Sequence, residues 1–370
     1  MKITSVEALH LRLPRVEMKA DGTQEVLIAR ICTDTGLVGH GEAVSCSTVA
    51  RAIIEAPRSA PFRHGLGAAL IGLDPCEVAA RWADMYEASR WYGRRGAVMH
   101  AIAAVDTALW DILGQDRGQP CHALWGTKRR SIRAYASVLF PDTPTEAAEL
   151  AQDLAGRGFT ALKFGWGRFG RDQAHDHAIL CAIRDAVGED VDLMVDAGRV
   201  WDVETAIARA RKLFEEFAIL WLEEPLREDD LDGYRQLSAA APGRIACGET
   251  EETLAQFIDL LERGVAVVQP DIGRAGGPSV CMRISEAAAA RDRWCVPHCF
   301  GSGVNLVSSI HWAAAAPAAP FIEYPFTESP LRNALVDGIP PMRDGQVTLP
   351  EAAGLGITLD EAVVARFRVA

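Results

Sequence analysis

Short apolar runs recur along the chain from residue 130 onward, and stretches with helical spacing separate them. The runs are RSIRAYASV, FTALKFGW, VDLMVDAG, AILWLE, RIACGE, VAVVQPD, RWCVPH and APFIEYP. Between them, stretches such as TPTEAAELAQDLAGRG and DVETAIARARKLFEEF place apolar residues at intervals near 3.6. A strand followed by a helix is one β/α unit of roughly 30 residues. The pattern therefore predicts an α/β fold with a TIM-like (β/α)8-type barrel over residues 126–326.

The first 125 residues follow a different pattern. Alternation in ITSVEALHLRL and EVLIARICTDTGLVGHGEAV predicts three antiparallel strands, with a turn at 33–36. We interpret 15–24 as a loop and 46–64 as a second, mobile loop. Helices are predicted from Asp74 onward and over the apolar stretch AVMHAIAAVDTALWDILGQ, which should be buried. Residues 1–125 are therefore predicted to form a separate α+β domain.

The last segment breaks the barrel period. Residues 327–370 include LVDGIPPMRDGQVTLPEAAGLGITLDE, which is rich in Gly and Pro. We expect this segment to return to the first domain.

Composition narrows the class of protein. The 370 residues are 49% hydrophobic and 24% charged, with a net charge of −12, which argues against a nucleic-acid partner. The nine dispersed cysteines form no CxxC pair, which favours reduced thiols and a cytoplasmic location. The N-terminus lacks the apolar core of a signal peptide, and we expect no membrane-spanning segment.

Ionisable residues close six consecutive predicted strands. They follow one another at intervals of 22 to 27 residues: Asp196, Glu223, Glu249, Asp271, His298 and Glu323. The carboxyl ends of the strands of such a barrel meet at one face, where catalysis occurs. We therefore expect these side chains around a single mouth.

Three of these residues predict a metal site. Asp196, Glu223 and Glu249 would repel one another, and a divalent cation relieves that repulsion. All-oxygen ligation favours Mg2+, or Mn2+, over Zn2+. Glu224 should lie behind Glu223, because neighbours on a strand take opposite faces.

The other candidates suggest acid–base chemistry. Asp271 can orient the His298 imidazole and raise its basicity. Glu323 could stay protonated beside an anion and donate to a developing oxyanion. Lys163 can face a substrate carboxylate. For two further residues the sequence leaves two interpretations open. Arg274 either acts directly at the site or supports it from behind, and Trp166 either forms a wall of the pocket or only packs against the core.

Together, these sequence motifs resemble those of the enolase superfamily and of its mandelate racemase-like subgroup. The resemblance rests on AVDTALWDILGQDRGQPCHALWG, MVDAG, WLEEPL, CGET, QPDIGRAGG, PHC and IEYP. It implies a modified (β/α)7β barrel with a capping domain, and Mg2+ bound by Asp196, Glu223 and Glu249. It also implies that the His298–Asp271 dyad abstracts the proton α to a carboxylate, giving a metal-stabilised enediolate, with Glu323 as electrophilic acid. The family's habit implies a homo-oligomer.

One departure from the subgroup bears on the reaction. The racemase of this subgroup carries Lys-x-Lys at the second strand, whereas this chain has Lys163-Phe164-Gly165. Without the second lysine, the chain lacks one of the two bases that racemisation needs. A single base still supports dehydration of an aldonate or aldarate to a 2-keto-3-deoxy acid, which is the leading hypothesis. Alternatives are a racemase or epimerase with a second base at His100 or Lys19, and a non-catalytic acid-sugar binder.

Overall fold

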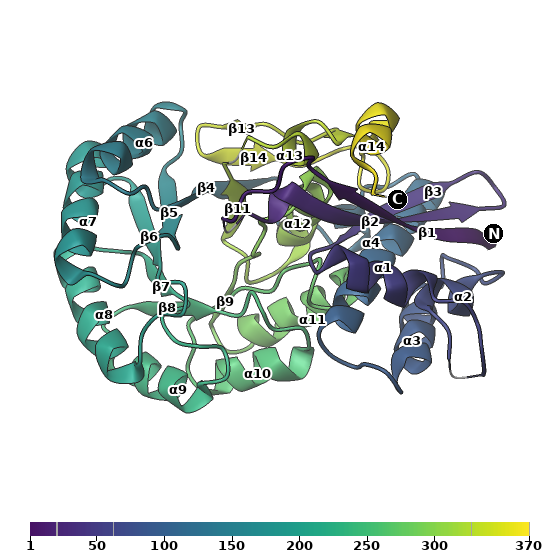
Figure 1. Ribbon diagram of the computed structural model, residues 1–370, viewed down its shortest axis with the longest axis horizontal. Coiled ribbons are helices and arrows are strands. Elements are labelled where there is room, and N and C mark those ends of the chain that lie inside the picture. The colour runs from purple at the N-terminus through teal and green to yellow at the C-terminus, as the bar shows by residue number, and fades with distance from the viewer. Residues whose placement is uncertain (20, 62, 327, 370) are drawn as a thin grey trace.

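The computed structural model of the chain describes residues 1–19, 21–61, 63–326 and 328–369. A ring of strands and helices lies beside a smaller part that contains the N-terminal sheet (Figure 1). The ring confirms the predicted barrel, and the smaller part confirms the predicted α+β cap. The domain boundaries at 125 and 326 remain predictions.

The barrel is built from eight strands in sequence order. They are β4 (Ser131–Leu139), β5 (Ala161–Gly165), β6 (Asp192–Asp196), β7 (Trp221–Glu223), β8 (Arg244–Cys247), β9 (Val267–Val268), β10 (Trp294–Cys295) and β11 (Phe321–Pro325). Neighbours from β4 to β10 pair in parallel, and β11 pairs in parallel with β4. The Cys295 N–H also donates to the Ala318 carbonyl at 2.8 Å, which ties β10 to the segment before β11.

One helix lies between each pair of successive barrel strands. These are α6 (Pro144–Gly156), α7 (Gln173–Val187), α8 (Val203–Phe217), α9 (Leu231–Ala240), α10 (Leu254–Glu262), α11 (Pro278–Ala289) and α12 (Gly303–Ala315). Eight strands with these intervening helices form the expected (β/α)7β arrangement. Local sequence determines where the helices begin: Thr143, for example, forms a reciprocal capping box with Glu146 and is followed by Pro144.

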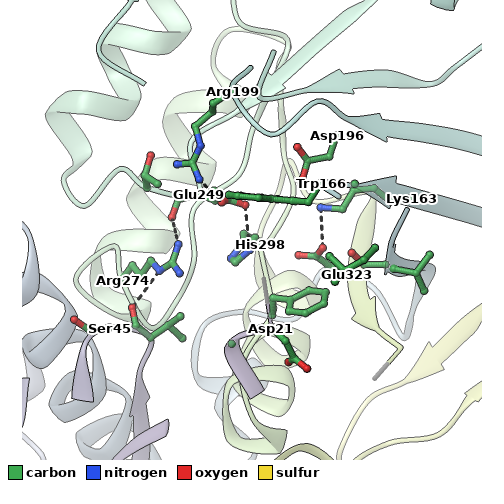
Figure 2. A pocket seen from close by; sticks show the side chains of 18 of the residues that line it. Asp21, Ser45, Lys163, Trp166, Asp196, Arg199, Glu249, Arg274, His298 and Glu323 are labelled. Carbon is green, nitrogen blue, oxygen red and sulfur yellow. Dashed lines mark hydrogen bonds and ion pairs between the residues drawn. The ribbon is translucent and has the colours of Figure 1, made fainter. Parts of the chain in front are cut away.

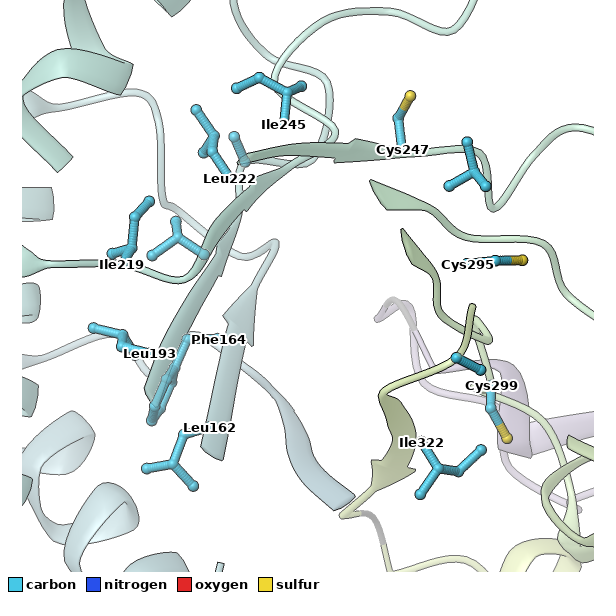
Figure 3. Close-up of a cluster of buried hydrophobic side chains, with 14 of the residues drawn as sticks. Leu162, Phe164, Leu193, Ile219, Leu222, Ile245, Cys247, Cys295, Cys299 and Ile322 are labelled. Carbon is cyan, nitrogen blue, oxygen red and sulfur yellow. The ribbon is translucent and has the colours of Figure 1, made fainter. Parts of the chain in front are cut away.

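Successive side chains of a barrel strand point to opposite faces, so the apolar core and the residues of the site lie on different faces of the strands. Leu162, Phe164, Leu193, Leu222 and Ile245 belong to the apolar cluster that packs between strands and helices (Figure 3). A second cluster forms the floor inside the barrel: Tyr135, Ala161, Met194, Trp221, Ala246, Val267, Val296 and Phe321. The candidate residues Lys163, Asp196, Glu223, His298 and Glu323 each stand two positions after a floor residue. The period of two therefore carries them above the floor, on the same interior face.

The N-terminal part pairs a sheet with helices. Strands β1 (Ile3–Arg12), β2 (Glu25–Thr33) and β3 (Val38–Ala43) are antiparallel in the order β1-β2-β3. The helices after them are α1 (Ser47–Glu55), α2 (Leu66–Leu70), α3 (Val78–Ser89), α4 (Ala97–Arg117) and the short α5 (Cys121–Leu124). A 3-10 turn, η1 (Gly22–Gln24), precedes β2.

Helix α4 qualifies the expectation about membranes. By length and composition it could cross a membrane, but 78% of its apolar window is buried inside the fold. Its apolarity is therefore that of a core helix packed against β3. All nine cysteines are free thiols.

Two predictions for the N-terminal part were wrong in detail. Residues 47–55 form α1 within the expected loop, because Ala50 and Ile54 lie one turn apart and are buried. Pro57 and Pro61 follow closely, so the stretch of residues with helical spacing is short and did not indicate a helix. Helix α3 begins at Val78 rather than near Asp74, whose carboxylate instead accepts from the Cys76 N–H in a turn.

The C-terminal segment touches both parts of the molecule. It contains α13 (Pro330–Asn333), β12 (Val336–Asp337), β13 (Met342–Arg343), β14 (Gln346–Thr348), β15 (Thr358–Leu359) and α14 (Glu361–Phe367). Val364 and Phe367 of α14 share an apolar cluster with Leu9 and Leu11 of β1. Strand β14 pairs antiparallel with β4, so the segment also extends the barrel sheet (Figure 1).

Candidate active site

A cavity of about 570 Å³ lies at the carboxyl ends of the barrel strands. This volume is in the usual range for small-molecule sites. Seven of the nine candidate residues line it: Lys163, Trp166, Asp196, Glu249, Arg274, His298 and Glu323. Glu223 and Asp271 are buried behind it, in contact with Lys163 and His298. The cap contributes Asp21, Gly22, Val44, Ser45, Cys46 and His100. Figure 2 labels Asp21 and Ser45 of these.

His298 and Asp271 form a fixed pair. His298 Nδ1 lies 2.7 Å from Asp271 Oδ2, and the second oxygen of Asp271 accepts from Gly273 N–H at 2.7 Å and Asn305 Nδ2 at 3.0 Å. Burial raises the pKa of Asp271, but the hydrogen bond and charge of His298 outweigh burial and lower it overall. An ionised Asp271 accepts from Nδ1–H, so Nε2 is the nitrogen that can exchange a proton with a ligand.

Glu249 controls the charge of this histidine. His298 Nε2 lies 3.2 Å from Glu249 Oε2. Burial lowers the pKa of His298, but Glu249, together with the Asp271 hydrogen bond, raises it to about 9. The imidazole therefore carries a proton at neutral pH while Glu249 stays beside it. Moving Glu249 away from Nε2 would lower this pKa, because its charge is the largest of the causes that raise it.

Lys163 is held by two carboxylates. Its Nζ lies 2.5 Å from Glu223 Oε1 and 2.8 Å from Glu323 Oε1. Burial raises the pKa of Glu323, but the Lys163 ammonium outweighs it, so the pKa is lowered overall. The nearest charged neighbour of Glu323 is therefore a cation, which favours its ionised form in this arrangement, and its role as a proton donor to a developing oxyanion remains a prediction.

The three expected metal ligands lie at the ends of β6, β7 and β8. Burial first, and then the charges of Glu223 and Glu249, raise the pKa of Asp196 well above its usual range. Among the described residues, no three His, Cys, Asp or Glu side chains are arranged as a ready metal site. Glu223 is turned toward Lys163 and Glu249 toward His298. The donor chemistry nevertheless fits a hard divalent cation, because three carboxylates converge there and their repulsion is only partly neutralised.

Gly165 provides room for Asp196. The two residues are partners in the β5–β6 register, and a Cβ added at Gly165 would lie 2.8 Å from Asp196 Oδ2. A side chain at this position would therefore displace the Asp196 carboxylate.

Arg199 is a cavity residue that sequence reasoning missed. Its guanidinium lies 4.9 Å from the centroid of the Trp166 ring, 3.2 Å from Glu224 Oε2 and 3.9 Å from Glu249 Oε1. Trp166 therefore both walls the cavity and packs against Arg199. Glu224, expected behind Glu223, serves as a partner of Arg199.

A repeated sequence pattern could have revealed Arg199. The chain reads Asp196-Ala-Gly-Arg199 after β6 and Asp271-Ile-Gly-Arg274 after β9. In both turns Oδ1 of the aspartate accepts from the glycine N–H two residues on, at 2.8 and 2.7 Å. Each turn places an arginine in the wall of the cavity.

The two cap residues considered as second bases differ in position. Lys19 is exposed, lies 3.1 Å from Glu17 and 3.6 Å from Asp21, and is not among the described residues that line the cavity. His100 does line it, with Nδ1 2.9 Å from Ser45 Oγ. Burial, followed by the charge of Arg274, lowers the pKa of His100 to about 4, so it is neutral and a weak base.

Both parts of the chain match known protein families. Residues 3–126 match the family described as mandelate racemase / muconate lactonizing enzyme, N-terminal domain. Residues 146–363 match the family described as enolase C-terminal domain-like.

Three similar proteins cover nearly the whole chain. D-galactarolactone cycloisomerase of Agrobacterium fabrum is 33% identical over 390 aligned positions, covering 100% of this chain and 99% of that protein. Arabinonate dehydratase of Saccharolobus solfataricus is 31% identical, covering 94% and 92%. The crystal structure of 3,6-anhydro-D-galactonate cycloisomerase from Zobellia galactanivorans has a TM-score of 0.90 at 29% identity and covers 100% of both chains.

Proposed function

Because the chain belongs to the mandelate racemase / muconate lactonizing enzyme subgroup of the enolase superfamily, we propose that it is a Mg2+-dependent dehydratase of a sugar acid, an aldonate or an aldarate. Similar curated proteins are mostly dehydratases of sugar acids. The observation that carries the proposal is the single base: His298 is oriented by Asp271, while Gly165 supplies no second base. One base favours elimination over racemisation.

The residues of the site would act in sequence. His298 Nε2 takes the proton from the carbon α to the carboxylate, while Asp271 holds the imidazole by Nδ1–H. The electron pair of the C–H bond forms a double bond as the β carbon–oxygen bond breaks. The imidazolium returns its proton to the departing hydroxyl, which leaves as water. The enol product tautomerises to a 2-keto-3-deoxy acid.

The surrounding residues would bind and orient the substrate. Lys163 faces the reacting carboxylate, and its ion pair with Glu323 fixes the ammonium in place. Trp166 walls the cavity, and Arg274 contacts the substrate. Asp196, Glu223 and Glu249 would hold Mg2+ or Mn2+. A cation bound there supplies electrostatic stabilisation of the negative charge that develops on the substrate carboxylate.

A cycloisomerase is the second candidate. It is favoured by the D-galactarolactone cycloisomerase, which is 33% identical and aligns over 99% of its length. The same base could eliminate a β oxygen that belongs to a ring, in which case no water is lost. A racemase or epimerase would need a second base, and the neutral His100 is a weak one. A binder without turnover would have no need of the His298–Asp271 pair.

The remaining expectations are part of the same proposal. The substrate is a small anionic acid, the protein works in the cytoplasm, and it forms a homo-oligomer. The cycloisomerases and dehydratases above act on small acids or lactones, as their names state, which supports the substrate class.

The test is a screen with Mg2+ against mono- and di-acid sugars and their lactones. Semicarbazide detects 2-keto acids, and mass spectrometry separates a product lighter by one water from one of unchanged mass. A 2-keto acid lighter by one water supports dehydration, and an isomeric product supports cycloisomerisation. If no sugar acid reacts while Mg2+ binding is intact, and deuterium from D2O enters at the α carbon from both faces, both proposals fail and epimerisation replaces them.

A further inference from the structure

Among the described residues, the lysine and the two arginines that line the cavity differ in their partners. Lys163 pairs with Glu223 and Glu323, and Arg199 pairs with Glu224 and Glu249. Arg274, which is half-buried, has no carboxylate partner among the described residues. Its side chain donates only to two backbone carbonyls, from Nε to Val44 at 3.1 Å and from Nη1 to Glu249 at 2.9 Å. Since a guanidinium has five N–H donors, it retains both charge and donors for a ligand.

The neighbours of Arg274 also have unused polar atoms. Val44 is followed by Ser45, whose hydroxyl lies 2.9 Å from His100 Nδ1, and Glu249 is followed by Thr250. His100 Nε2 and Thr250 Oγ1 are buried and have no hydrogen-bond partner among the described residues, although buried polar atoms are normally satisfied. Both residues line the same cavity.

This group lies away from the reacting end. In Figure 2, Arg274 and Ser45 are on one side of His298, and Lys163 and Glu323 are on the other. Two further acidic side chains of the cavity wall, Glu252 and Asp21, have other partners: Glu252 accepts from Gln256 at 3.2 Å, and Asp21 lies 3.6 Å from Lys19. Neither forms a described ion pair with Arg274. The charge of Arg274 also acts on Asp271 and helps to lower the pKa of that carboxyl, but the two form no described ion pair. The cavity therefore has a cation at the far end that can still pair directly with an anion.

We propose that Arg274, Ser45, His100 and Thr250 form a subsite for a second carboxylate, and that the substrate is a linear dicarboxylic sugar acid. This rests on the proposed function, in which Lys163 and His298 take the reacting end. The planar guanidinium fork matches a carboxylate. With Ser45 donating to His100 Nδ1, the neutral ring carries its proton on Nε2, and Thr250 adds a hydroxyl donor. The terminal hydroxyl of a monoacid would leave the charge of Arg274 unpaired.

The test compares di- and mono-acids of equal length in the Mg2+-loaded, full-length protein. Arg274→Met should lower kcat/KM for the dicarboxylic sugar acid about 100-fold relative to the monoacid, since a charge-assisted contact is lost. Thr250→Val changes a hydroxyl with no protein partner, so it should lower the same ratio about tenfold without lowering the unfolding midpoint. Arg211, which is exposed on α8, serves as a control for the loss of a positive charge. Arg211→Met should leave the ratio of the two kcat/KM values unchanged.

A binding measurement separates this subsite from the reaction. Adipate has two carboxylates and no hydroxyl, so it cannot be dehydrated, and hexanoate is its monoacid match. Calorimetry should show tighter binding of adipate, and Arg274→Met should remove the difference. If no sugar acid turns over but this pattern holds, the proposed function fails and the subsite stands. If both acids bind equally to the unmodified protein, or if Arg274→Met weakens both acids equally, the subsite is refuted.

Discussion

The ammonium group of Lys163 lies 2.8 Å from a carboxylate oxygen of Glu323, deep inside the barrel. Both side chains are almost fully buried, and Lys163 also neutralises Glu223. The candidate metal ligand Glu223 and the candidate acid Glu323 are therefore joined through one cation. This link explains why Glu323 is ionised here.

Replacing Lys163 by Met should destabilise the metal-free protein by about 3–5 kcal/mol, because Glu223 and Glu323 would remain buried without a cation. Urea unfolding in the presence of a chelator measures the change. A loss below about 1 kcal/mol would mean that water or protonation already neutralises the two carboxylates.

The His298–Asp271 pair should be needed for turnover but not for metal binding. His298→Asn and Asp271→Asn should each lower kcat by at least about 100-fold, since the base is lost or is no longer oriented. Mg2+ affinity, measured by calorimetry, should fall by no more than a few-fold. Loss of both properties together would contradict the separate roles assigned to the dyad and the carboxylates.

Glu249→Gln should weaken Mg2+ binding at least about tenfold, because an amide oxygen replaces a charged ligand. Titration of the metal-free variant with Mg2+ tests this directly. An unchanged affinity would remove Glu249 from the ligand set and leave it as a partner of His298 and Arg199 alone.

Gly165→Ala should disturb the metal site although it adds only one methyl group. The new Cβ would lie 2.8 Å from both Cβ and Oδ2 of Asp196. Displacement of the carboxylate should weaken Mg2+ binding and cost about 1–3 kcal/mol of stability. Calorimetry and urea unfolding check the two effects, and wild-type values for both would show that β5 moves aside.

His311 should make stability depend on pH. This buried residue of α12 accepts from the His122 N–H at 3.2 Å and bonds the Leu355 carbonyl at 3.1 Å, and burial lowers its pKa to about 3. The unfolded chain, with an ordinary histidine pKa near 6.5, binds more protons between these values, so stability falls as pH drops below about 6.5.

His311→Gln keeps a donor and an acceptor but does not titrate. Between pH 7 and pH 4 the wild-type protein should lose about 3 kcal/mol more stability than this variant, as measured by chemical unfolding at each pH. Equal losses would indicate that His311 becomes protonated without unfolding.

Sequence patterns predicted the barrel because short apolar runs alternate with stretches of helical spacing, and ionisable residues such as Asp196, Glu223 and His298 close those runs. The same spacing predicted which side chains approach one cavity. Helix α1 was missed because its periodic stretch is short and two prolines follow it. The ionised state of Glu323 could not be predicted, since it depends on Lys163, which is distant in the chain. Arg199 could have been found from the Asp-x-Gly-Arg pattern that it shares with Arg274, but its contacts with the Trp166 ring and Glu224 depend on the fold and could not be predicted.

The cap and the barrel share a buried polar network. Glu42 of β3 accepts from the Ser302 and Asn305 backbone N–H groups at 2.9 Å each, and Asn305 Nδ2 donates to Asp271. The orientation of the His298–Asp271 pair is therefore connected to a residue of the first sheet. Chimeras that graft a foreign cap onto this barrel to change its specificity would have to preserve a carboxylate at position 42. Without one, recombination would disturb the His298–Asp271 pair as well as the loops of the cap.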